Sequence, residues 1–228
     1  MNNVTHLIQS IKPISYDLDL TPDLSSFTFK GKERVTFELL QATDQLIWHA
    51  RDLKIGSAVI NDEALSITYN KDDETVTLAS KEELPTGQYV LQIDYTGEIN
   101  DSLHGWYRSK YQQNGETKWL ATTQFEATAA REAFVCIDEP AAKATFDVTL
   151  HVDEELDAIS NGQIVKSETT NGVKHVKFEQ TPIMSTYLLA FLVGEFEYIE
   201  TTNDEGVIVR VYTVPGKKEH GARSEERR

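Results

Sequence analysis

The amino-acid sequence predicts an all-β fold, a large antiparallel β-sandwich with one short helix. Apolar and polar residues alternate along most of the chain, which gives each segment one buried and one solvated face, as in antiparallel sheets. Turn-forming residues separate these segments, and helical spacing is nearly absent. We therefore expect about a dozen strands with meander or Greek-key connections.

The individual elements follow from these patterns. The continuously apolar run Leu188 to Val193 predicts a strand buried on both faces. Ala127 to Phe134 is the one helical segment, because its Ala, Glu and Arg residues favour about two turns. The alternating segments are residues 16–20, 35–39, 65–69, 89–95 and 146–152.

Tight turns are expected where Asn precedes Gly, because both residues tolerate the positive φ that short hairpins require. These pairs are Asn114-Gly115, Asn161-Gly162 and Asn171-Gly172. The sequence Pro85-Thr86-Gly87 separates two strands in the same way. No repeat or low-complexity segment is present.

Composition limits the function. The chain has 228 residues, 39% of them hydrophobic, and a formal net charge of −15. A chain with this much negative charge is not expected to bind nucleic acid or an anionic membrane through electrostatic attraction. The negative charge would instead attract a cationic group such as the amino terminus of a peptide. Met1 to Ser10 lacks signal-peptide features, and Tyr187 to Val193 is too short to span a bilayer, so we predict a cytoplasmic protein.

Composition also divides the chain. Residues 1–215 are expected to form one β-domain. The last segment, residues 216–228, has five basic and three acidic residues and one Ala as its only apolar side chain. We expect it to be a disordered tail, or a truncated linker or helix start.

Catalytic motifs are missing from the sequence. The six histidines lie about 20 or more residues apart, so none forms the i, i+4 ligand pair of a zinc helix, and H-E-x-x-H does not occur. No G-x-S-x-G nucleophile elbow or glycine-rich phosphate loop is present. The single cysteine, Cys136, is expected to be a small buried apolar side chain. The aromatic residues of 105–111 are expected to pack in a hairpin, not to stack on bases.

The polar residues between Gln124 and Glu139 remain the candidates for chemistry. Gln124 and Glu126 are two apart, so on one strand they would share a face at the strand's end. Spacing alone fits a solvated strand end as well as a site. Asp138 and Glu139 fit either loop solvation or pairing with Arg131.

Several blocks in register give a more specific signal. They are residues 105–109, 123–126, 130–131, 133–140, 143–146 and 182–191, within a similarity that spans about Lys12 to Pro215. In these blocks the chain resembles the amino-terminal domain of zinc aminopeptidases of the aminopeptidase N (alanyl/lysyl aminopeptidase) family. The resemblance implies a saddle-shaped β-domain followed, in the full enzyme, by a thermolysin-like zinc domain. It also implies that Glu126 binds the substrate's α-ammonium group and that Gln124 lines the pocket for the first side chain.

The sequence departs from the family pattern at several positions. Val135 stands where Pro is usual, Ile137 where an aromatic residue is common, and Ala129 where Asp is common. The zinc helix and the family's Gly-Ala-Met-Glu-Asn block are absent. We therefore predict that the chain binds no cofactor, has no metal ligands or catalytic residues of its own, and is inactive alone, with zinc held by the full-length enzyme.

Two other functions remain open. The chain could be a stand-alone, non-catalytic peptide-binding or interaction module. It could also be a sandwich that binds carbohydrate through Trp106, Tyr107 and Trp119.

Overall fold

A computed structural model describes residues 6–221 of the chain, and it confirms the all-β fold class. Over those residues the chain forms seventeen strands. This is more than the dozen expected, because several of the strands are too short for an alternating pattern to reveal them. One short α-helix, α1 (Lys218–Gly221), is present near the end of the described part. The 3-10 turns in this range are η1 (Leu7–Gln9), η2 (Ala130–Glu132) and η3 (Thr186–Leu188).

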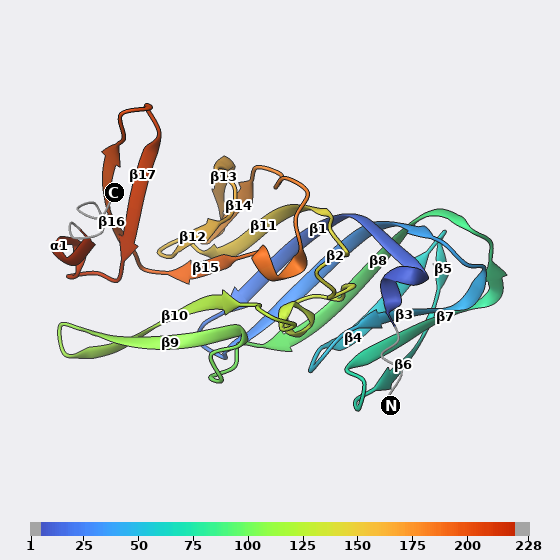
Figure 1. Ribbon diagram of the computed structural model, residues 1–228. Coiled ribbons are helices and arrows are strands. Elements are labelled where there is room, and N and C mark those ends of the chain that lie inside the picture. Colours follow the sequence, from blue (N-terminus) through green and yellow to red (C-terminus); the bar gives the residue numbers. More distant parts are fainter. Residues whose placement is uncertain (1–5, 222–228) are drawn as a thin grey trace.

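An eight-stranded sheet forms the body of the molecule (Figure 1). Neighbouring strands are antiparallel except β1 and β11, which pair in parallel, an exception to the predicted pattern. In spatial order the strands are β13 (Ile164–Thr170), β14 (Val173–Phe178), β11 (Thr145–Asp153), β1 (Ile11–Asp23), β2 (Thr28–Leu39), β8 (Gly87–Glu98), β4 (Lys54–Ile60) and β5 (Glu63–Ala64).

Two smaller sheets pack on one face of the large sheet. The four-stranded sheet is β12 (Asp157–Ser160), β15 (Phe191–Gly194), β10 (Glu116–Gln124) and β9 (Gly105–Gln113). The three-stranded sheet is β3 (Thr43–His49), β7 (Thr75–Leu84) and β6 (Ser66–Asn70).

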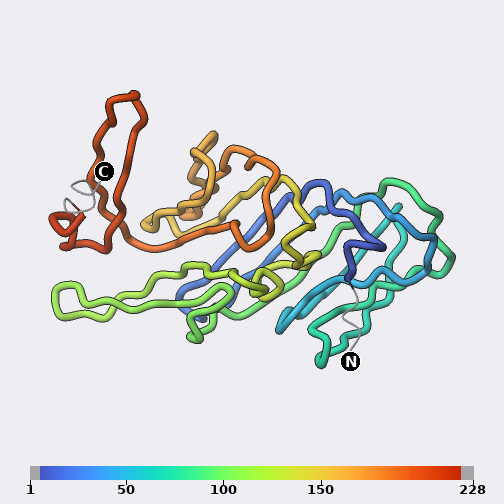
Figure 2. The backbone as a smooth tube through the Cα atoms, viewed as in Figure 1, coloured from blue at the N-terminus to red at the C-terminus, as the bar shows by residue number. Residues whose placement is uncertain are grey.

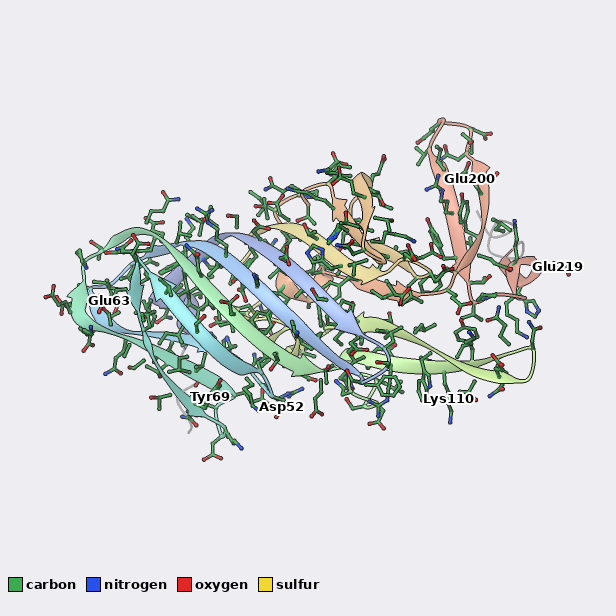
Figure 3. All side chains as sticks on the ribbon, turned by 180° about the vertical axis from the view of Figure 1, so that it is seen from behind. Asp52, Glu63, Tyr69, Lys110, Glu200 and Glu219 are labelled. Carbon is green, nitrogen blue, oxygen red and sulfur yellow. The ribbon has the colours of Figure 1, made fainter. Side chains whose placement is uncertain are left out.

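Aromatic contacts show how the layers meet. Trp106 of the four-stranded sheet lies 4.7 Å, centroid to centroid, from Phe29 of β2. Trp48 of the three-stranded sheet lies 5.3 Å from Phe37, at the other end of β2. Phe29 and Phe37 share one face of their strand. The smaller sheets therefore sit side by side on the same face, and no element among residues 6–221 covers the opposite, open face of the large sheet (Figure 3).

The predicted alternation is confirmed in the large sheet. Tyr16, Leu18 and Leu20 of β1 are fully buried, and the inward side chains of β2, β8 and β11 join the same core. Trp106 is also fully buried, against Phe29 and Phe191. It therefore cannot serve as the exposed platform that carbohydrate binding would need.

Two of the three Asn-Gly predictions are confirmed. Asn114-Gly115 joins β9 to β10, and Asn171-Gly172 joins β13 to β14, each with positive φ at both residues. Asn161-Gly162 is not such a turn. The Asn161 side chain instead bonds to the Leu188 carbonyl (2.9 Å) and the Ala190 N–H (2.8 Å).

Two local predictions were wrong. Ala127 to Phe134 forms turns and the single 3-10 turn η2 instead of two helical turns, because the side chains of Arg131 and Glu132 bind distant partners and Phe134 is fully buried in the core. The strand expected over Leu188 to Val193 begins only at Phe191, and Leu188 is 50% exposed at the end of η3.

Near the end of the described residues, a hairpin projects from the body (Figure 1). Its strands are β16 (Glu197–Thr202) and β17 (Ile208–Thr213), and α1 packs on both, with Gly221 close to Ile199 and Val211. Residues 222–228, the rest of the predicted tail, lie outside the described residues.

Candidate functional site

The predicted site residues lie where β10 ends. Gln124 is the last residue of the strand, paired with Gly105, and Glu126 lies just beyond it in a turn, so the two do not occupy one strand. Phe125 between them is 2% exposed and packs on Phe134 and Phe191 at 6.1 and 5.7 Å. Gln124 and Glu126 are both exposed. The exposed–buried–exposed alternation thus continues past the strand, and the peptide bond after Glu126 is cis.

Glu126 opens the long connection from β10 to β11, residues 125–144, which we call the core loop. It runs between β10 and β3, where Cys136 pairs with His49 (Figure 2). From Ala129 to Asp138 every residue except Glu132 is buried. This irregular segment is therefore part of the hydrophobic core.

Four consecutive amides fix the centre of the core loop. The Val135 N–H donates to Oε2 of Glu33 (3.0 Å), and the Cys136 N–H donates to the His49 carbonyl (3.1 Å). The Ile137 N–H donates to the Tyr16 hydroxyl (3.2 Å), and the Asp138 N–H to Nδ1 of His49 (3.1 Å). Buried amides need such partners, and here three strands supply them in place of a sheet ladder.

A chain of alternating charges holds the other side of the core loop. Arg131 contacts Asp138 (Nε–Oδ2 3.1 Å) and Glu74 (Nη1–Oε2 3.0 Å). Arg51 contacts Glu74 (Nη1–Oε1 2.7 Å) and also ion-pairs with Glu132. The predicted pairing of Arg131 with Asp138 is confirmed. It ties the core loop to the β6–β7 turn.

Neighbouring polar groups complete this anchoring. The second carboxylate oxygen of Asp138 accepts a hydrogen bond from the Thr186 hydroxyl (2.7 Å). Glu139 does not join the network. It accepts hydrogen bonds from the N–H groups of Leu7 (2.6 Å) and Ile8 (3.3 Å) and contacts His6 (3.1 Å), so it fixes the start of the described chain.

Burial changes the titration of several of these groups. Burial, and then the Arg131 charge, lower the pKa of His49 to about 4, so this ring is neutral when it accepts the Asp138 N–H. Burial raises the pKa of Glu33 well above its usual range. Burial also raises the pKa of Cys136, which is fully buried as predicted, so it is not an activated thiol. For Glu74, burial would raise the pKa, but the Arg51 and Arg131 contacts outweigh it and lower it.

A cleft of about 810 Å³ lies beside the core loop. His49, Thr128, Arg131, Asp138 and Glu139 contribute to its lining. Gln124 and Glu126 are not among its lining residues. The cleft therefore borders the anchoring network, not the two predicted binding side chains.

Comparison with known proteins adds the family. The model of the Peptidase M1 N-terminal domain matches residues 12–188. The chain belongs to this family. The match includes the core loop and nearly all of the predicted similarity.

Curated relatives of this M1 N-terminal domain are named as aminopeptidases. Aminopeptidase M1-B of Oryza sativa subsp. japonica is 42% identical over 212 residues, which is 92% of this chain and 24% of the relative. Puromycin-sensitive aminopeptidase of Caenorhabditis elegans is 44% identical over 221 residues, 92% of this chain and 23% of the relative. Aminopeptidase 2 of Candida albicans is 40% identical over 215 residues. The chain spans about a quarter of the length of these relatives.

Metal ligands are not gathered in the described part of this M1 domain. Residues 6–221 contain no group of three or more His, Cys, Asp or Glu side chains that could hold a metal ion. Histidines distant in sequence do meet in one place that spacing could not reveal, since His151 and His175 face each other across β11 and β14. Over the same residues, no helix has the length and apolar character needed to cross a membrane.

Sequence reasoning also missed the buried partners of the core loop in this M1 domain. Glu33 offered a signal, because it is a charged residue at an inward position of β2, in phase with Phe29 and Val35. Arg51 and Glu74 offered none, since each lies in a polar turn region.

Proposed function

We propose that this chain is the amino-terminal β-domain of a zinc aminopeptidase that removes amino-terminal residues from peptides. The family match and the names of the relatives support this proposal. Residues 6–221 bring together no group of three or more His, Cys, Asp or Glu side chains, so they supply no three-ligand set of the kind that a catalytic zinc site uses. Under the proposal zinc is held by a separate, thermolysin-like catalytic domain, and this chain contributes to substrate binding.

Glu126 is the side chain that we propose receives the substrate's α-ammonium group. It is exposed, and within residues 6–221 its carboxylate has no hydrogen-bonding or ion-pairing partner. Gln124, exposed on the other side of buried Phe125, is proposed to line the pocket for the first side chain. The observation that carries this proposal is the contrast between these free polar groups and the firmly held segment that follows them.

The chemistry suits an exopeptidase. A carboxylate pairs strongly with a primary ammonium group through charge-assisted hydrogen bonds. Once the two groups are removed from water, a substrate with a blocked amino terminus leaves the carboxylate without its partner and is rejected. The firmly held backbone that follows Glu126 also favours binding, because less of the protein has to become ordered when the substrate binds.

The test is a Glu126→Ala substitution in the full-length enzyme that carries this domain. We expect kcat/KM for an aminoacyl substrate to fall, because the ammonium group loses its ion pair. The decrease should correspond to a loss of about 2–4 kcal/mol in transition-state stabilisation. Glu116→Ala, an exposed glutamate at the start of the same strand β10, is the matched control and should leave kcat/KM unchanged.

An unchanged kcat/KM in Glu126→Ala would remove the proposed role of Glu126. The domain assignment has its own test, the DNA sequence downstream of the Arg228 codon. Continuation into H-E-x-x-H with a later Glu supports it, whereas a stop codon with no such motif in any frame contradicts it and favours a non-catalytic module.

A further inference from the structure

The open face of the eight-stranded sheet carries a histidine pair that the proposed peptidase function does not use. His151 on β11 and His175 on β14 are directly opposite in the antiparallel register. Their strand neighbours Leu150, Val152 and Val176 are at most 1% exposed and point into the core. Both histidines therefore project from the outer face, where each is half-buried and reachable from solvent.

The two rings present the same nitrogen to each other. Their Nδ1 atoms are 2.5 Å apart, with ring centroids at 4.7 Å and the planes at 70°. At this distance only one of the two nitrogens can carry a hydrogen toward the other. Each ring thus directs a nitrogen lone pair, or the single shared proton, at the same point between two adjacent strands.

Asp19 on β1 fixes the tautomer of one ring. Its Oδ1 lies 2.8 Å from Nε2 of His151, so that nitrogen donates a hydrogen bond and leaves Nδ1 as the acceptor. A carboxylate on the outer nitrogen of a histidine is the arrangement that orients metal-binding histidines and raises their basicity.

We propose that His151 and His175 form a two-histidine site for a divalent transition-metal ion, with Zn²⁺ as the best match. Imidazole nitrogens suit Zn²⁺, Cu²⁺ and Ni²⁺. Zn–N bonds of about 2.0–2.1 Å at a tetrahedral angle need the nitrogens roughly 3.3 Å apart, so the rings separate by less than about 1 Å when the ion binds between them. His175 then carries its ring hydrogen on Nε2 in place of Nδ1, so both Nδ1 lone pairs face the ion.

The surroundings carry charges of both signs. Asp17 and Asp147 face each other on β1 and β11 of the same outer face, and Glu168 on β13 is opposite His175. Burial and then the Asp147 charge raise the pKa of Asp17, whereas Lys177 and Arg34 lower it. Because the described residues supply no third ligand, water completes the coordination and the ion exchanges freely. When bound, it links β11 to β14, and Asp19 extends that link to β1.

The test is a titration of the 228-residue chain with Zn²⁺ followed by calorimetry. We expect one saturable equivalent, which is lost in His151→Gln and in His175→Gln. Asp19→Asn should keep the site but weaken it by about 10–100-fold, as loss of an outer hydrogen-bond partner does. His104→Gln, a change at an exposed histidine near the start of β9, is the control and should bind like wild type.

A second measurement needs no variant and guards against misfolding. In wild-type protein, Zn²⁺ should shift the imidazole NMR signals of His151 and His175 and leave those of His104 in place. The proposal is overturned if no saturable equivalent binds to the wild-type chain, or if either histidine variant binds Zn²⁺ like wild type. It is equally overturned if the ion shifts other histidines instead, which would leave the pair as a plain hydrogen bond.

Discussion

The core loop and the β16–β17 hairpin invert the usual relation between regularity and burial. The core loop has almost no regular structure, yet from Ala129 to Asp138 all its residues but Glu132 are buried. The hairpin pairs along its whole length, from Glu197 opposite Thr213 to Thr202 opposite Ile208, yet neither of its strands has a buried residue. Strand pairing supplies hydrogen bonds to the backbone amides of the hairpin. Attachment to the hydrophobic core depends instead on the burial of apolar side chains.

The difference has a functional consequence. Glu126 is the second residue of the core loop, and this loop is tied to β1, β2 and β3 by amide hydrogen bonds and to the β6–β7 turn by Arg131 and Glu74. Under the proposed role of Glu126, the backbone that follows the binding carboxylate is fixed before substrate arrives. The hairpin differs, because among the described residues its strands pack mainly on each other and on α1.

The largest expected effect comes from breaking the buried ion pair of the core loop. Asp138 is 2% exposed, Arg131 is 8% exposed, and Asp138→Ala leaves the guanidinium without its buried partner. We expect a loss of about 3–5 kcal/mol in the free energy of unfolding, measured by urea denaturation. In the hairpin, Ile208→Ala at a 58% exposed position should change it by no more than about 0.5 kcal/mol. Equal effects at the two positions would contradict the contrast.

A smaller effect is expected from His49, which accepts the Asp138 amide. Its pKa is about 4 in the folded chain against an ordinary 6.5, so between these values the unfolded chain binds a proton that the folded chain does not. The contribution of His49 to the free energy of unfolding should therefore fall as the pH is lowered, by about 2 kcal/mol between pH 7 and pH 5.

The control for this pH effect is His49→Asn, which removes the titrating ring. Urea denaturation of this variant should show a flatter dependence between pH 7 and pH 5 than wild type. If the two proteins lose stability in parallel over that range, His49 is not the group responsible.

Sequence patterns were sufficient where a strand lies in the large sheet. In β1, β2, β8 and β11 alternation alone identified the inward residues, because period two is fixed by strand geometry. Patterns failed over Ala127 to Phe134, where local helical propensity gave way to tertiary contacts of Arg131 with Glu74 and of Glu132 with Arg51. Those partners lie far from this segment in the sequence, and no local window contains them.

The candidate site shows the same division. The positions of Gln124 and Glu126 at the end of a strand, and the pairing of Arg131 with Asp138, could be predicted. The second contact of Arg131, with Glu74, could not, because it depends on how the three-stranded sheet is placed. His151 and His175 likewise meet only through the register of β11 on β14.

Hydrogen exchange, measured for each amide of the native chain, distinguishes the core loop from the hairpin. We expect the amides of Val135, Cys136, Ile137 and Asp138 to exchange only with global unfolding, because each is buried and bonded to a strand of the core. The bonded amides of β16 and β17 should exchange much faster, through local opening of the hairpin. Core-loop amides that exchange as fast as those of the hairpin would contradict the claim that the segment following Glu126 is firmly held.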